Sequence, residues 1–464
     1  MSNPLAYVFS CIFVLLAHGA MLFSVFYNGS YDDVNAVIVL MAAVIGLDAV
    51  YFIILPFFKQ QTYAVDFMLI LILNMGLIFQ SCFGGVEFRF KHFITMIAAL
   101  IACRIGYFAC RDHRWIEDKR KFIWIGIGIL MGVILLFTGS RSMWISLGES
   151  TSVQPSEFIK PLLVLACATS VTEQQKKHKL LCFNVVYENL ILFGIVAGVC
   201  LFQWWCRDLG SIPTFGAIYV SGFLLRICYP KGKYSKKPII IAVAALAVLA
   251  VIGIIVAPPY VRDRLFVDVW NDKNGHGYQQ AQALIGIADG GWFGKRPGHG
   301  FLHNVFAYNS DIVFATISEE WGLLFSVMSV FVLLMIMAIP LVNPPRSYYH
   351  GSMCAGIAAA FSVQMALNIF GSCNMIPFTG VTLPFISMGG TSMVVSGLMA
   401  GMLVAAQSPA FKAPKKKKQE QKKPQPVPSQ QMQPVPPQQP QLLPPRQDVP
   451  QQPPVSYTLT DRRK

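Results

Sequence analysis

Charged side chains are scarce in this chain of 464 residues: Asp, Glu, Lys and Arg make up 13%, whereas hydrophobic residues make up 54%. A soluble protein carries about a quarter charged residues, so this deficit predicts an integral membrane protein. The 11 cysteines include no CxxC pair, which argues against a thiolate metal site. No basic face or recognition motif accompanies the net charge of +14, so nucleic acid is not an expected partner.

Long apolar segments fill most of the chain, and a membrane-spanning helix needs about 20 apolar residues. The segments are 6–27, 36–58, 64–82, 92–110, 121–138, 157–171, 189–203, 210–228, 237–257, 312–340, 351–371 and 389–407. We therefore predict an all-α polytopic membrane protein with about 12 transmembrane helices. In this prediction, residues 1–407 form the membrane domain, and residues 258–311 form its large extracytoplasmic loop.

The distribution of Lys and Arg predicts the orientation of these helices. Basic residues gather in the connectors that follow even-numbered segments, such as 111–121 and 231–237, whereas the first connector carries Asp32 and Asp33. By the positive-inside rule both termini are cytoplasmic, and the long loop lies outside. Residues 408–464 are rich in Lys, Pro and Gln and are expected to form a disordered cytoplasmic tail.

Polar side chains at the start of the sixth segment are a first candidate site. Gln154 precedes Glu157 and Lys160, which stand one helical turn apart. A pair of charges is costly in an apolar helix, so it is expected to face the bundle interior or a watery cavity. The outer loop just before it carries Arg141 and Trp144, and a tryptophan at this boundary is typical of an interfacial anchor.

Further charged residues stand near the outer ends of later segments. Arg207 and Asp208 either form a surface ion pair or supply a phosphate ligand. Asp311 lies where the long loop enters the tenth segment and is either a helix cap or a functional acid. Glu319 and Glu320 follow about two turns deeper. Three carboxylates that enter a membrane in this way predict a polar cavity.

Two prolines and a glycine pair interrupt the apolar pattern between the last two segments. Pro377, Pro384, Gly389 and Gly390 break any continuous helix there. Broken backbone at membrane depth is tolerated only where it lines protein or water.

Taken in order, these motifs resemble those of the SEDS family, the bacterial shape, elongation, division and sporulation proteins that include FtsW, RodA and SpoVE. The resemblance covers roughly residues 139–407. Its motifs are Gln154-Pro155-Ser156-Glu157-x-x-Lys160, Asp208-Leu209-Gly210, Tyr278-Gln279…Gln282…Gly290-Gly291, Asp311-Ile-x-Phe-Ala with Glu319-Glu320-x-Gly322, and Pro384-Phe385-Ile386-Ser387-x-Gly389-Gly390-Thr391-Ser392.

The resemblance implies a peptidoglycan glycosyltransferase that polymerises lipid II at the outer face of the bacterial cytoplasmic (inner) membrane. It also implies a ten-helix core, here with two extra N-terminal helices, and a class B penicillin-binding protein as the transpeptidase partner, alongside other divisome or elongasome proteins. It makes Asp311 the catalytic residue. The residues expected to bind lipid II and the nascent glycan strand are Gln154, Glu157, Lys160, Arg207, Asp208, Gln282, Ser387, Thr391 and Ser392. The expected supporting residues are Arg141, Trp144, Glu319, Glu320, Gly389 and Gly390.

Some positions depart from the family's pattern. Met143 stands where an Arg is usual before the tryptophan, Met388 stands where a Tyr is common, and Asn309-Ser310 replaces His-Thr before the aspartate.

The expected chemistry is general-base removal of a sugar hydroxyl proton by Asp311, provided that burial raises its pKa. Positive charge from Lys160, Arg207, Arg141 or Arg296, or from a divalent cation such as Mg²⁺ or Mn²⁺, would stabilise the pyrophosphate leaving group. Glu157 would orient Lys160, and the glutamates of the tenth segment would hold a metal or brace the bundle. Two alternatives stay open: a lipid II flippase or transporter, and a non-enzymatic divisome or elongasome scaffold.

Overall fold

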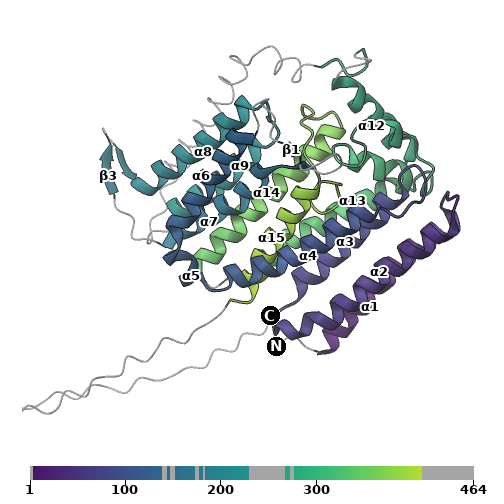
Figure 1. The fold of residues 1–464 in the computed structure, drawn as a ribbon, viewed down its shortest axis with the longest axis horizontal. Coiled ribbons are helices and arrows are strands. Elements are labelled where there is room, and N and C mark those ends of the chain that lie inside the picture. The colour runs from purple at the N-terminus through teal and green to yellow at the C-terminus, as the bar shows by residue number, and fades with distance from the viewer. Residues whose placement is uncertain are drawn as a thin grey trace, which may run out of the picture. The chain divides into compact units, whose positions relative to one another are not determined.

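Helices carry nearly all of the regular structure in the computed structural model (Figure 1). The structure describes residues 4–137, 144–146, 152–172, 177–180, 183–228, 267–271, 276–345 and 347–409. Before the first strand lie α1 (Pro4–Asn28), α2 (Val34–Ile54), the 3₁₀ helix η1 (Leu55–Phe58), α3 (Ala64–Cys82), α4 (Phe90–Cys110), α5 (His113–Asp118) and α6 (Arg120–Phe137). After it lie η2 (Pro155–Phe158), α7 (Ile159–Thr172), α8 (Tyr187–Trp205), α9 (Ile212–Cys228), α12 (His276–Gly290), η3 (Leu302–Asn304), α13 (Val313–Val342), α14 (Tyr348–Ser372) and α15 (Gly390–Gln407).

Two short antiparallel strand pairs complete the described structure. Strands β1 (Ile145–Ser146) and β2 (Ser152–Val153) pair Ile145 with Val153. Strands β3 (Lys177–Leu180) and β4 (Phe183–Val186) pair Lys177 with Val186.

Seven of the described helices are long and apolar enough to cross a membrane, which makes this a multi-pass membrane protein. Eleven of the twelve predicted segments coincide with helices, and the boundaries 64–82 match α3. The predicted segment 237–257 lies outside the described residues, so the number twelve stays a prediction. The expected tail also lies outside them beyond residue 409.

Helices α4 and α15 lie side by side over much of their length (Figure 1). Glycines on both helices make this possible, because a Cβ atom at Gly106 would collide with the Leu398 carbonyl. A Cβ atom at Gly401 would likewise collide with the Cys103 carbonyl. Without a hydrophobic driving force between helices in lipid, such close backbone packing is a main source of association.

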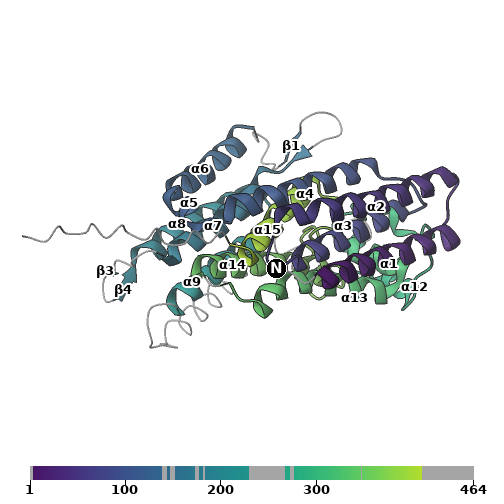
Figure 2. The same ribbon diagram turned by 90° about the horizontal axis from the view of Figure 1, so that it is seen from below.

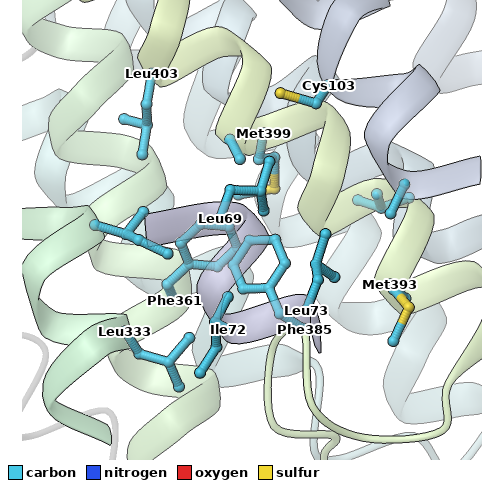
Figure 3. Packing of buried hydrophobic residues seen from close by; sticks show 14 of the residues in the cluster. Leu69, Ile72, Leu73, Cys103, Leu333, Phe361, Phe385, Met393, Met399 and Leu403 are labelled. Atoms are coloured by element: carbon cyan, nitrogen blue, oxygen red, sulfur yellow. The ribbon is translucent and has the colours of Figure 1, made fainter. Parts of the chain in front are cut away.

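Helix α3 is buried along almost its whole length. The segment between α14 and α15 inserts Phe385 into the same core, as Figure 3 shows, where its ring lies 5.4 Å from that of Phe361. The expected broken segment therefore packs against protein at depth, which satisfies the requirement that irregular backbone be shielded from lipid.

The two extra N-terminal helices, α1 and α2, lie beside α3 (Figure 2). A buried polar cluster joins the three helices. His18 Nδ1 lies 2.6 Å from Asp48 Oδ2, and Asn74 Nδ2 donates to Asp48 Oδ1 at 2.9 Å. All three side chains are fully buried. Because lipid offers no hydrogen-bonding partner, these contacts hold α1 and α2 against α3 specifically.

The long loop contains a helix that the sequence did not predict, since α12 covers residues 276–290 of the segment 258–311, which we expected to form an extracytoplasmic loop. The tenth predicted helix is also not continuous. Gly322 has φ 87° and ψ 161° within α13, a conformation that favours glycine. Loop residues enter this break, with Leu323 N–H donating to the Gly291 carbonyl at 2.9 Å.

Candidate active site

Several segments that are distant in sequence surround a cavity of about 710 Å³. They are η2 and α7, the turn between α8 and α9, helix α12, the turn before α13, and the segment between α14 and α15. Its lining includes three carboxylates, Glu157, Asp208 and Asp311, and two cations, Lys160 and Arg207. Five charged residues that the sequence scattered over some 150 positions therefore line one cavity. This gathering makes the cavity the candidate active site.

Asp311 is positioned by a tight turn of the backbone. The Ala307 carbonyl accepts the N–H of Ser310 at 3.1 Å and that of Asp311 at 2.9 Å, and Ala307 itself has φ 55°. The Asp311 carboxylate is not a helix cap, because Ile312 is the N-cap residue of α13 and makes no side-chain capping bond. Asp311 Oδ1 instead accepts the Ser310 hydroxyl at 2.7 Å.

Burial raises the pKa of Asp311 to about 6, although the hydrogen bond from Ser310 lowers it. A carboxyl group with a pKa near working pH can accept a proton while still being mostly ionised at neutral pH. Asp311 therefore has the protonation behaviour of a general base.

Two polar side chains support this turn from below. Asn368 Nδ2 donates to the backbone carbonyl of Asp311 at 2.9 Å and to that of Val381 at 2.8 Å. Ser387 Oγ donates to the Ser310 carbonyl at 2.7 Å. Ser387 was expected to bind substrate, but its hydroxyl contacts backbone, and it is not among the residues that line the cavity.

The cavity lining also carries the charged residues of η2 and α7, Glu157 and Lys160. Lys160 Nζ lies 2.6 Å from Glu157 Oε1, and both side chains are almost fully buried. Gln154 Nε2 donates to Asp208 Oδ2 at 3.1 Å, and Ser211 Oγ donates to the same oxygen at 2.9 Å. Burial raises the pKa of Asp208, and the Ser211 hydrogen bond opposes this rise.

Arg207 and Trp144 also line the cavity. Arg207 adopts φ 62°, a left-handed backbone conformation that non-glycine residues rarely adopt and that often accompanies functional sites. Trp144 is 48% exposed. Arg141 and Met143 lie outside the described residues.

Comparison with known proteins agrees with this arrangement of motifs and helices. The family model for FtsW, RodA and SpoVE, described as "Cell cycle protein", matches residues 57–410. The chain belongs to the FtsW/RodA/SpoVE family. Helices α1 and α2 precede the matched residues.

Curated relatives of this family match at similar levels. The probable peptidoglycan glycosyltransferase FtsW of Tolumonas auensis is 28% identical over 339 residues, which cover 69% of this chain and 84% of that protein. Stage V sporulation protein E of Bacillus subtilis is 27% identical over 319 residues, which cover 67% and 83%. These matches extend over most of the relatives' length, so the similarity is not confined to one motif.

A solved structure shares the fold. It is a chain from a structure described as the structural coordination of polymerization and crosslinking by a peptidoglycan synthase complex. The two chains are 19% identical with a TM-score of 0.57, and the likeness covers 75% of this chain and 97% of that chain.

Two departures from the FtsW/RodA/SpoVE pattern meet beside the cavity. Asn309 and Met388 are 79 positions apart, yet Asn309 Nδ2 lies 3.3 Å from Met388 Sδ. The backbone also joins them, because Met388 N–H donates to the Asn309 carbonyl at 2.9 Å. The two replacements therefore form one contact.

Glu319 and Glu320 do not line the cavity, which corrects the expectation that all three descending carboxylates share a polar space. Glu319 accepts the N–H groups of Phe301 at 2.7 Å and Leu302 at 3.0 Å. Glu320 accepts those of Gly84 at 3.0 Å and Gly298 at 2.9 Å. Because loop backbone reaches the break in α13, these carboxylates brace the loop.

The remaining expected residues divide between the cavity and its surroundings. Gln279 of α12 lines the cavity, whereas Gln282 is not among its lining residues. Thr391 Oγ1 accepts the Gln154 N–H at 3.2 Å, and Ser392 Oγ lies 2.9 Å from Thr382 Oγ1. Gly389 lies in the cavity wall, and Gly390 lies beside it as the first residue of α15.

Asn368 was not among the predicted site residues, although the sequence contains a signal for it. Gln364 and Asn368 stand four residues apart in the apolar segment that forms α14, so they lie on one face of the helix. Gln364 lines the cavity and Asn368 supports the Asp311 turn. Polar residues on one face of a membrane helix predict an inward-facing site.

Proposed function

We propose that this protein is a peptidoglycan glycosyltransferase that polymerises lipid II into glycan strands in cell division or elongation. The observation that carries this proposal is Asp311, a carboxylate with a pKa of about 6, in one cavity with Lys160 and Arg207. Membership of the family also supports the proposal, because curated relatives are named probable peptidoglycan glycosyltransferases.

In the proposed reaction, Asp311 accepts the proton of the 4-hydroxyl group of the acceptor sugar. The freed oxygen attacks the anomeric carbon of the donor sugar, a new C–O bond forms, and the bond to the polyprenyl pyrophosphate breaks with its electron pair. Base catalysis of this kind contributes about 10²–10⁴-fold to a rate. The Ser310 hydrogen bond keeps the carboxylate oriented.

The departing pyrophosphate requires positive charge, and two groups in the cavity supply it. Lys160 is held by Glu157 at 2.6 Å, so its ammonium group is oriented before substrate binds. Arg207 lies in the same lining and offers the planar donor arrangement that suits phosphate oxygens. Fixed charges in a partly dry site stabilise a developing anion without reorganisation.

The described residues do not fit a divalent cation well, because no three His, Cys, Asp or Glu side chains among them gather as a metal site. Glu319 and Glu320 are occupied by loop N–H groups. The proposed reaction therefore includes no step on Mg²⁺ or Mn²⁺, and a cation requirement remains a proposal that metal removal would test.

The proposed location is the bacterial cytoplasmic membrane, with both termini in the cytoplasm and the cavity open to the outer face. A lipid-linked substrate suits this location, since its tail stays in the bilayer while its sugars enter the cavity. The proposed partner is a class B penicillin-binding protein, with other divisome or elongasome proteins. A structure that shares this fold is part of a peptidoglycan synthase complex.

The test is polymerisation of labelled lipid II by the purified protein, with and without its penicillin-binding protein. Asp311→Asn preserves the shape of the side chain and removes the base. Asp289→Asn is the matched control, because Asp289 is an exposed residue of α12 that pairs with Lys295 and does not line the cavity. We expect strands from wild type and Asp289→Asn and at least about 100-fold less product from Asp311→Asn.

Other outcomes identify the alternatives. An active Asp311→Asn variant would remove Asp311 from the mechanism. Absence of strands together with lipid II translocation in vesicles would indicate a flippase. Tolerance of the Asp311 change in cells, combined with loss of function on deletion of 408–464, would indicate a scaffold.

A further inference from the structure

A second cavity of about 520 Å³ adjoins the candidate active site. The two cavities share Trp144, Met388 and Gly389 in their linings. Whereas the first cavity lies towards α7 and α9, the second lies between the start of α4 and the start of α15. The proposed reaction assigns no role to the second cavity.

His92 is the unexplained group in this second cavity. It belongs to α4, is fully buried and lines the cavity. Neither ring nitrogen has a hydrogen-bond partner within the described part of the chain. A buried polar group without a partner costs about as much as a lost hydrogen bond, and each such group in a native protein requires an explanation. A ligand that hydrogen-bonds to the ring nitrogens of His92 supplies this explanation.

The other lining residues indicate the chemistry of that ligand. Thr95, Asn309 and Thr391 add hydrogen-bonding groups and Lys91 adds an ammonium group, while Trp144, Phe158 and Val394 add apolar surface. A pocket that combines an aromatic ring and apolar walls with a few separate polar groups suits a molecule with hydroxyl groups on an apolar ring. A sugar has this character.

We propose that the second cavity binds the acceptor saccharide and that His92 is a substrate-contacting residue for it. This inference rests on the proposed glycosyltransferase function. Asn309 lines the second cavity, and Asp311 lines the first only two residues further on. In this proposal an acceptor seated against His92 extends towards Asp311 past Met388 and Gly389, which line both cavities, while the pyrophosphate-bearing donor occupies the cavity with Lys160 and Arg207.

The test compares His92→Leu, which removes both ring nitrogens, with His92→Gln, which restores a donor and an acceptor. His350→Leu is the matched control. His350 is also a buried histidine, but it hydrogen-bonds to the Cys110 carbonyl at 3.1 Å and lines neither cavity. The measurements are polymerisation of labelled lipid II, thermal unfolding in detergent, and inhibition by a soluble disaccharide that carries the free 4-hydroxyl group.

We expect His92→Leu to polymerise about tenfold more slowly, as for one lost hydrogen bond. It should also lose inhibition by the disaccharide and unfold at the same or a higher temperature than wild type. His92→Gln should recover most of the rate. His350→Leu should unfold at a lower temperature and keep the inhibition. This combination separates substrate contact from a structural role, because a structural histidine would stabilise the free protein.

Unchanged inhibition in His92→Leu, or a lower unfolding temperature like that of His350→Leu, would overturn the inference. If wild type makes no strands, the proposed function fails, and ligand-observed NMR of the disaccharide with wild type and His92→Leu still decides the saccharide site. Equal binding to both proteins, or to neither, would then overturn it.

Discussion

Removing the hydroxyl group of Ser310 tests the role of Asp311 without removing the base. That hydroxyl donates to Asp311 Oδ1 at 2.7 Å and favours the ionised carboxylate, so its loss raises the pKa of Asp311 above about 6. A hydrogen bond to a charged group is worth about 1.5 kcal/mol, which corresponds to about one pKa unit. We therefore expect a pKa of about 7 in Ser310→Ala.

The sign of the effect on activity follows from the role of a base. Asp311 accepts a proton only when ionised, so activity falls as the pH drops through its pKa. A group with a pKa of about 6 is about half ionised at pH 6 and about 90% ionised at pH 7, whereas a pKa of about 7 gives about 9% and about 50%. Relative to its own rate at pH 9, Ser310→Ala should therefore be about fivefold slower than wild type at pH 6 and about twofold slower at pH 7.

The assay is the initial rate of lipid II polymerisation by purified protein between pH 5 and pH 9. Ser211→Ala is the matched control, because it removes a hydroxyl group from the same cavity that donates to Asp208 and not to Asp311. In the pH–rate profile of Ser211→Ala, the midpoint of the fall on the acidic side should stay near pH 6, even if the maximum rate falls. An acid-side midpoint that does not shift in Ser310→Ala, or that shifts equally in Ser211→Ala, would refute the assignment of that midpoint to Asp311.

Two further predictions concern how the site is supported. A Cβ atom at Gly380 would lie 3.0 Å from Asp311 Oδ2, and Gly380 has φ 66°, so Gly380→Ala should cost about 1 kcal/mol of stability and slow polymerisation. Unaltered kinetics and thermal unfolding would contradict this. Glu320→Gln leaves one of the two backbone N–H groups that Glu320 accepts without a carboxylate oxygen. This should lower the free energy of unfolding by about 1–3 kcal/mol, measured by unfolding in detergent. Unchanged stability would show that these hydrogen bonds do not stabilise the loops.

The features that the sequence predicted well depend on local composition. The expected segment 64–82 matches α3 because length and hydropathy alone define a membrane helix. Asp311 and the Glu157–Lys160 pair were recognised because charges in apolar surroundings are costly, and the structure places all three in one cavity lining. Such signals are contained within a few residues of sequence.

The features that were missed depend on contacts between distant residues. Asn368 lies 57 positions from Asp311, to which its amide donates, and composition does not reveal such a pairing. Helix α12 was not predicted because it is short and contains Gly277, Gly286 and Gly290, and glycine disfavours a helix. Ser387 looked like a ligand for substrate, but its hydroxyl is used by the backbone of the turn that carries Asp311.

The glycines of the long loop acquire a physical meaning only when the break in α13 is considered. A Cβ atom at Gly290 would collide with the Ser318 carbonyl, and one at Gly322 would collide with the Trp292 carbonyl. Close approach of backbone to backbone therefore explains these glycines, and no phosphate is needed. Since the same approach brings loop N–H groups to Glu319 and Glu320, two buried carboxylates are neutralised in effect by hydrogen bonds. Asp311, just before this helix, makes no such contact with loop backbone N–H groups in the described structure, which leaves it the carboxylate of the three that is able to exchange a proton with substrate.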